Sequence, residues 1–399
     1  METRTMGRLN AALSGMSSNL LVLLACTFLD RVGEGFTRGV STNFMVSTIG
    51  LSGTQVMWMT GIREIPGLLL IFIAVLLARM PLSRQASLAL VLMGIGYALY
   101  AAANSFTTLV AVSLLASIGF HTWFPMHTSL GLALSDVKDS GRTLGLIASV
   151  GALASILGMA LTAVLAPWLS LRAFHVVAGA VMASAGLLVL KIPASVGLRR
   201  ATQPRLLLRR RYWLYYVLTF FEGSRTQVFH AFGTLILVQQ YGLTARDISL
   251  LLTASAVVNF ALTPYLGRLL DVAGERTTMT VSYLLLALCF VGYATVHNPW
   301  FLSLMLIGIN LLVTLHFGLA SYLNRIAPRD DLTPSLNAGV SINHITAVSM
   351  SLLTGTLLAR VGYETLCWGA VVVVLISVPF ALMLKVQTKT AAAAQGSAA

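Results

Sequence analysis

The sequence predicts an all-α membrane protein with twelve transmembrane helices in two pseudo-symmetric six-helix bundles. The first observation is composition: hydrophobic residues fill 57% of the 399 positions and charged residues only 10%. A soluble globular chain is about a quarter charged. The second observation is an internal repeat. Segment 27–30 reads TFLD, and segment 219–222 reads TFFE, 192 residues later.

The same offset relates further positions of the two halves. Segment 50–52 reads GLS and segment 242–244 reads GLT, while Thr42 corresponds to Thr234. Both TFLD and TFFE lie in long apolar segments, and each places a carboxylate deep inside one. Two similar halves with a buried acid in the first helix of each are typical of secondary transporters.

A membrane-spanning helix needs about 20 mostly apolar residues. The expected spans are 18–44, 54–78, 86–104, 107–132, 143–167, 171–190, 213–240, 246–269, 277–296, 300–324, 336–359 and 364–385. They predict an N-terminal bundle (1–190), a basic cytoplasmic linker (191–212), a C-terminal bundle (213–388) and a disordered tail (389–399).

The net charge of +13 is distributed asymmetrically. If the N-terminus is cytoplasmic, loops on that side hold 19 lysines and arginines, and the opposite loops hold only Arg172, Arg246 and Arg360. This bias predicts a multi-pass protein of the cell inner (cytoplasmic) membrane with both termini in the cytoplasm. Six arginines of the linker are expected to fix topology and attract anionic membrane lipids rather than nucleic acid: Arg199, Arg200, Arg205, Arg209, Arg210 and Arg211.

Eight ionisable residues lie inside the expected helices, each at an insertion cost of at least about 2.5–3.5 kcal/mol. They are Asp30, Arg31, Glu34, Arg38, Arg63, Glu64, Glu222 and Arg225. Their equal numbers of acids and bases suggest a paired network facing a cavity. Asp30, Glu34 and Arg38 are spaced to form one stripe along the first helix. An alternative is that these residues form structural ion pairs between helices and do not contact substrate.

Further polar residues accompany these charges. His230 follows Glu222 and Arg225 in the seventh helix, and Pro66-Gly67 after Glu64 predicts a kink in the second. His121, Trp123 and His127 lie in the fourth helix, His316 in the tenth, and Asn343-His344 in the eleventh. His121 and His127 are six residues apart and point in different directions, so they cannot hold one ion together. Neither a metal site nor a cofactor is expected.

Segment 267–276 reads GRLLDVAGER and resembles the signature loop of the major facilitator superfamily, Gly-x-Leu-x-Asp-x-x-Gly followed by two basic residues. It falls between the eighth and ninth helices, where the second half of that family carries its copy. Glu275 replaces the first basic residue. The equivalent first-half segment, 75–84, reads VLLARMPLSR, with Arg79 in place of the Asp.

The resemblance implies the major facilitator fold, in which helices one, four, seven and ten line a central cavity. It also implies gating roles for four loop residues: Gly267, Asp271, Gly274 and Arg276.

The fifth helix has glycines at 145, 151 and 158 but lacks the Gly-Pro of the family's antiporter motif. Those glycines predict a close helix-packing face.

The expected function is secondary active transport of a small polar or amphipathic organic solute by alternating access, coupled to protons. Asp30, Glu34 and Glu222 are the expected proton acceptors. The buried arginines favour a carboxylate or phosphate on the substrate, although four acids oppose this preference. An alternative is a protein that translocates or senses lipid or lysolipid; a metal-ion exporter is a third. No catalytic motif points to an enzyme, and a monomer is expected.

Overall fold

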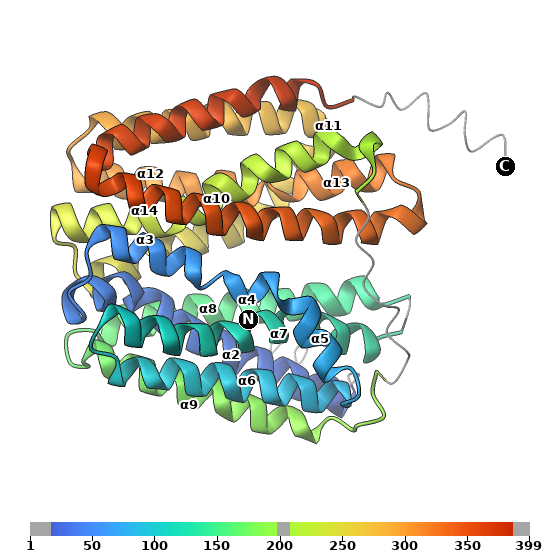
Figure 1. Ribbon diagram of the computed structural model, residues 1–399. Coiled ribbons are helices and arrows are strands. Elements are labelled where there is room, and N and C mark those ends of the chain that lie inside the picture. Colours follow the sequence, from blue (N-terminus) through green and yellow to red (C-terminus); the bar gives the residue numbers. More distant parts are fainter. Residues whose placement is uncertain (1–16, 137, 198–207, 386–399) are drawn as a thin grey trace, which may run out of the picture. The chain divides into compact units, whose positions relative to one another are not determined.

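The computed structural model describes residues 17–136, 138–197 and 208–385, and these residues form helices and turns without any strand (Figure 1). The chain divides into two compact units. Unit 1 comprises Met1–Thr202 and Gly242–Thr253, and unit 2 comprises Gln203–Tyr241 and Ala254–Ala399. We describe each unit by itself.

Unit 1 contains the helices coloured blue to green in Figure 1. Within it, α6 packs along α7 and α9, and α2 packs along α8 and α9. The elements are α2 (Ser18–Asn43), η1 (Phe44–Thr48), α3 (Gly53–Ile62), α4 (Ile65–Leu68), α5 (Leu70–Leu77), α6 (Leu82–Leu99), η2 (Tyr100–Ala102), α7 (Phe106–Ala133), α8 (Ser140–Leu165), α9 (Leu171–Leu188) and η3 (Val189–Lys191).

Unit 2 contains the second set of long helices, in which α10 packs along α14. The elements are η4 (Arg210–Tyr212), α10 (Trp213–Tyr241), α11 (Ala245–Thr295), α12 (Pro299–Thr314), α13 (Phe317–Ile326) and α14 (Arg329–Leu382). The residues of α11 up to Thr253 belong to unit 1.

The helices confirm the predicted fold class. By length and apolarity alone, seven helical segments of the described chain qualify as membrane spans. Two of these, 245–295 and 330–382, are long enough for two spans each, and Gly274 (φ 77°) and Gly362 (φ 75°) interrupt them. Glycine adopts positive φ without steric cost, so the chain can turn there. The four charged residues inside α2, the charged and other polar residues inside α10, and the breaks between α3 and α5 lower the apolarity or the length of these segments, which are therefore not among the seven.

The internal repeat is visible in the backbone. Gly50 (φ 77°) and Gly242 (φ 67°), which are 192 positions apart, both adopt the left-handed conformation. Each precedes a capped helix. Ser52 accepts a hydrogen bond from the Gln55 backbone N–H (3.3 Å), and Thr244 accepts one from that of Asp247 (3.3 Å). The same turn followed by a capped helix thus begins a helix in each half.

The predicted kink in the second span is confirmed. Regular helix stops at Ile62 and resumes in two short pieces, α4 and α5, around Pro66. Proline lacks a backbone N–H and clashes with the preceding turn, which interrupts the helical hydrogen bonds. The Arg63 carbonyl, at this break, accepts a hydrogen bond from the Ser117 hydroxyl of α7.

The predicted packing face of the fifth span is confirmed at Gly158 only: a Cβ on Gly145 would meet no atom within 4 Å, and one on Gly151 would make ordinary side-chain contacts. A Cβ on Gly158 of α8 would contact the carbonyl oxygen of Val32 and lie 3.0 Å from the Cα of Gly35. A Cβ on Gly35 would lie 2.6 Å from the carbonyl oxygen of Ser155. The backbones of α2 and α8 therefore approach so closely that only glycine fits at the crossing, which fixes the helix that carries Asp30.

Candidate functional site

Asp30 is the centre of a buried polar group in unit 1. Its side chain is almost fully enclosed, with the residue 3% exposed. The indole Nε1 of Trp123, on α7, donates a hydrogen bond to Asp30 Oδ2 at 2.9 Å. Arg31 Nε lies 3.6 Å from the same oxygen, and its Nη1 forms an ion pair with Glu34. One guanidinium therefore bridges two carboxylates.

The ion pairs of the first helix differ from those that the spacing of Asp30, Glu34 and Arg38 suggested. Asp30, Glu34 and Arg38 share one helix face, but the bridging cation is Arg31 and Arg38 is exposed. The long Arg31 side chain reaches carboxylates one residue before it and three after it, because neighbouring turns of a helix are close in space. The stripe alone did not identify this arrangement.

The two histidines of α7 have different partners, as the helical geometry predicts. His127 Nε2 lies 3.0 Å from the Thr27 hydroxyl of α2, and its ring centroid is 5.2 Å from that of Trp123. His121 is buried, with Nδ1 3.0 Å from the Ser117 hydroxyl and Nε2 3.5 Å from Glu64. His127 thus belongs to the Asp30 group, and His121 belongs to the kinked second span.

The kinked span contributes the remaining predicted charges of unit 1. Arg63 Nε lies 4.0 Å from Glu64 Oε1. Both residues are half-buried, and both lie in the turn between α3 and α4, where regular helix is interrupted. Because Glu64 is also near His121, this pair connects the break to α7.

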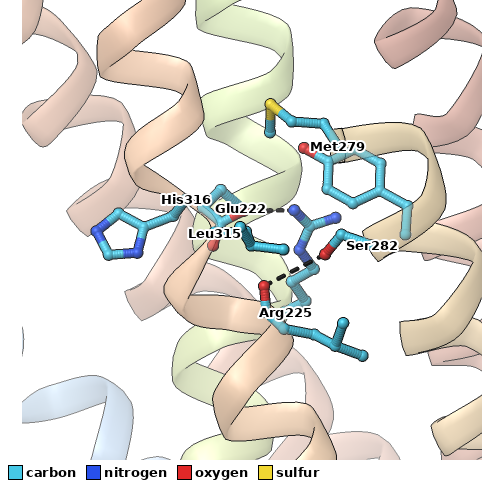
Figure 2. A pocket seen from close by; sticks show the side chains of 8 residues that line it. Glu222, Arg225, Met279, Ser282, Leu315 and His316 are labelled. Carbon is cyan, nitrogen blue, oxygen red and sulfur yellow. Dashed lines mark hydrogen bonds and ion pairs between the residues drawn. The ribbon is translucent and has the colours of Figure 1, made fainter. Parts of the chain in front are cut away.

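Unit 2 has its own buried ion pair. Glu222 and Arg225 lie one turn apart on α10, are 6% and 5% exposed, and form a salt bridge (Figure 2). Thr226 donates a hydrogen bond to the other Glu222 oxygen at 3.0 Å. The Arg225 guanidinium carbon lies 4.0 Å from the centroid of the Tyr283 ring of α11, a cation–π contact.

A small pocket opens beside this pair. It is lined by Glu222, Arg225, Met279, Ser282, Tyr283, Leu312, Leu315 and His316. Ser282 donates its hydroxyl to the Leu312 carbonyl (3.3 Å), which links α11 to α12. In Figure 2 the His316 ring points away from the guanidinium. The residue is exposed, so it belongs to the rim of the pocket.

The other predicted residues of unit 2 lie less centrally. His230 is exposed. The backbone of Asn343, on α14, lies close to Gly223 of α10. A Cβ on Gly223 would lie 2.8 Å from the Asn343 carbonyl oxygen and 3.0 Å from its Cα. Its neighbour His344 is half-buried. The α10–α14 contact therefore places Asn343 directly behind the Glu222–Arg225 turn.

In the signature loop the buried and paired acid is Glu275, whereas the acid expected to have a role was Asp271. Asp271 and Arg276 are exposed. Gly274 makes the turn, and Gly267 lies in open space, since a Cβ there would have no atom within 4 Å. Glu275, which replaces a basic residue of the pattern, is 5% exposed. It accepts a hydrogen bond from Ser321 (2.8 Å) and pairs with Arg325 Nε (2.9 Å), both on α13. The sequence marked Glu275 only as a departure from the pattern.

Two of the linker arginines also have protein partners. Arg209 lies 3.1 Å from Asp331 at the start of α14, Arg211 forms an ion pair with it, and Tyr212 donates its hydroxyl to it at 2.9 Å. Burial raises the pKa of Tyr212, and its hydrogen bond to Asp331 raises it further. The phenol therefore remains a donor. Arg199, Arg200 and Arg205 lie outside the described residues.

Sequence reasoning missed Thr27, Tyr283 and Asp331. Thr27 belonged to the TFLD repeat, so the repeat itself could have marked it. Tyr283 is one aromatic residue in an apolar helix, and Asp331 follows another acid at a helix start. Only the fold shows that these side chains reach Arg225 and Arg211.

Comparison with known proteins identifies the family. The sequence model of the Major Facilitator Superfamily matches residues 23–331 and 215–398. No curated protein sequence matches the chain.

Solved structures share its fold. A variant of the nucleoside transporter NupG superposes with a TM-score of 0.78 at 13% identity, covering 92% of this chain and all of NupG. A bacterial homologue of the human lysosomal transporter Spinster gives 0.72 at 15% identity, covering 92% and 96% of the two chains. The peptide transporter POT, in complex with alafosfalin, gives 0.71 at 14% identity, covering 91% and 94%. The chain is therefore a multi-pass membrane transporter, not an enzyme, and it belongs to the major facilitator superfamily.

Proposed function

We propose that this protein is a proton-coupled secondary transporter of a small polar or amphipathic organic solute, working by alternating access across the cytoplasmic membrane. The observation that carries the proposal is that each half buries one carboxylate at the same repeat position, Asp30 and Glu222, against an arginine of its own helix. Buried charge in a membrane helix is costly and usually functional.

The pairs have the chemistry that coupling requires. Arg225 balances Glu222 alone, whereas Arg31 is shared between Asp30 and Glu34. Protonating Glu222 leaves Arg225 to attract another partner, and protonating Asp30 leaves Arg31 with Glu34 alone. Binding of a proton at Asp30 or Glu222 would thus change what Arg31 or Arg225 can bind.

The aromatic and polar neighbours support an amphipathic solute. Trp123 and Tyr283, both buried, place large apolar rings beside the two charged groups. Aromatic faces stack on flat organic groups, and the adjacent charges fix orientation. Similarity in fold to transporters named for nucleosides and for peptides is consistent with such a solute.

Transport into proteoliposomes tests the proposal. The full-length protein would be reconstituted and given an imposed pH gradient, with a panel containing a nucleoside, a dipeptide and an aromatic carboxylate. We expect one class to accumulate, and we expect a protonophore to abolish the accumulation. Equal movement with and without the gradient would contradict proton coupling.

Orientation is a separate part of the proposal. The arginine and lysine distribution supports cytoplasmic termini. Cysteines introduced at Thr3 and Ser397 should react with a membrane-impermeant maleimide only in inverted vesicles.

A further inference from the structure

We propose that Arg225 is the residue that receives an anionic group of the transported solute, a carboxylate or a phosphate, in the pocket between α10, α11 and α12. The inference rests on the proposed function and names the chemistry that this site would recognise. It is carried by an imbalance in the hydrogen bonding of the Glu222–Arg225 pair.

Arg225 is buried but only partly satisfied. The residue is 5% exposed, and its Nη2 carries the ion pair with Glu222. Its Nε and Nη1 have no hydrogen-bond partner among the residues that the structure describes. A guanidinium offers five N–H donors; Glu222 accepts from one side of the group, and the Tyr283 hydroxyl is the other oxygen close to it. Buried polar groups in proteins are normally hydrogen-bonded.

Glu222 shows the opposite condition. One carboxylate oxygen accepts from Arg225 and the other from Thr226. Both oxygens of the acid are therefore engaged, while donors of the base remain. A ligand that completes this site must supply acceptor atoms. A cationic ligand would have to compete for oxygens that are already bound and would meet the guanidinium directly.

The surroundings hold the guanidinium in place for such a ligand. The Tyr283 ring lies under it, with the guanidinium carbon 4.0 Å from the ring centroid, and Glu222 fixes one edge. Figure 2 shows the Arg225 head group facing the space between α10 and α11 rather than the His316 side. A planar, fixed guanidinium is suited to carboxylate and phosphate oxygens.

The rest of the pocket lining is largely apolar. Met279, Leu312 and Leu315 contribute apolar walls, and the Ser282 hydroxyl donates to a backbone carbonyl. In this structure the space beside the pair is too narrow for a whole solute, so the assignment concerns the anionic group alone. We therefore expect a small organic acid or phosphate ester in preference to an inorganic cation.

Binding of matched fluorinated probes tests this assignment. The full-length protein in phosphatidylcholine nanodiscs would be titrated with 3-fluorobenzoate and with the neutral 3-fluorobenzamide, followed by ¹⁹F NMR. We expect benzoate to bind at least tenfold more tightly than the amide. Inorganic phosphate should compete with benzoate if the site accepts either anion.

Variants assign the binding to Arg225. Removing Arg225 alone would leave Glu222 buried without its partner, so the pair is neutralised together as Glu222→Gln with Arg225→Gln. This double variant should lose benzoate binding at least tenfold. Arg225→Lys should weaken it less, since the charge remains. Arg360→Gln, at an exposed arginine of α14, is the matched control and should bind normally.

The outcomes separate this inference from the proposed function. Equal binding of benzoate and benzamide, unchanged binding in the double variant, or absence of anion binding would overturn the anion site. Competition by an anionic lipid added to the nanodiscs would retain the site and make a lipid headgroup its source. Arg225-dependent binding without gradient-driven transport would instead contradict the proposed function and leave the anion site standing.

Discussion

The indole N–H of Trp123 donates to the Asp30 carboxylate at 2.9 Å and thereby connects α7 to α2 inside unit 1. Because both residues are at most 3% exposed, this hydrogen bond forms away from water. It gives Asp30 a neutral donor in addition to the charged Arg31.

Replacing Trp123 by Phe tests the value of that hydrogen bond. The variant retains an aromatic ring but removes the donor, which should lower the free energy of unfolding by about 1–3 kcal/mol. Thermal unfolding of the purified protein would measure it. Trp168→Phe is the control, since Trp168 is 78% exposed. Equal effects in the two variants would show that the bond to Asp30 contributes nothing specific.

The stability of the α2–α8 crossing should require glycine at position 158 of α8 but not at position 145. Gly158→Ala introduces a Cβ against the Val32 carbonyl, and overpacking of this kind costs about 1–3 kcal/mol. Gly145→Ala, in the same helix, meets no atom within 4 Å and should be neutral or stabilising. Comparable losses of thermal stability in both would contradict the close crossing.

Glu275 should matter more for stability than Asp271. Glu275→Gln weakens the contacts with Arg325 and Ser321, and we expect a loss of about 1 kcal/mol because Arg325 is partly exposed. Asp271→Asn should leave unfolding unchanged and should shift cysteine accessibility from the two membrane sides if the loop gates transport. A larger stability loss in Asp271→Asn than in Glu275→Gln would reverse our assignment.

Asp331 should hold the end of the linker in place. Asp331→Asn removes the charge that Arg209 and Arg211 share, so trypsin should cleave after these arginines several-fold faster. Its neighbour Asp330 is exposed, which makes Asp330→Asn the matched control. If both variants are cleaved at the wild-type rate, the arginines serve the membrane surface alone, as the sequence suggested.

Composition and the TFLD and TFFE repeat were sufficient to predict the fold class, because apolar length and internal symmetry are properties of the chain itself. The kink at Pro66 and the packing face around Gly158 followed from local sterics in the same way. The Glu222–Arg225 pair was predictable from its spacing on one helix.

Contacts between helices were not predictable from spacing. Arg31 bridges two acids because of how its side chain lies, and Tyr283 reaches Arg225 only because α11 packs beside α10. Glu275 and Arg211 likewise find partners on helices distant in sequence. A single sequence contains no signal for such pairings.

The most direct test of the account neutralises the two repeat-related acids one at a time. Proton-driven transport by Asp30→Asn and by Glu222→Gln would be measured in proteoliposomes under an imposed pH gradient, with reconstituted amount and thermal stability as controls. Because these carboxylates are proposed to bind the coupling proton, each variant should lose gradient-driven accumulation by at least tenfold while remaining folded. Wild-type rates in both variants would contradict the central claim.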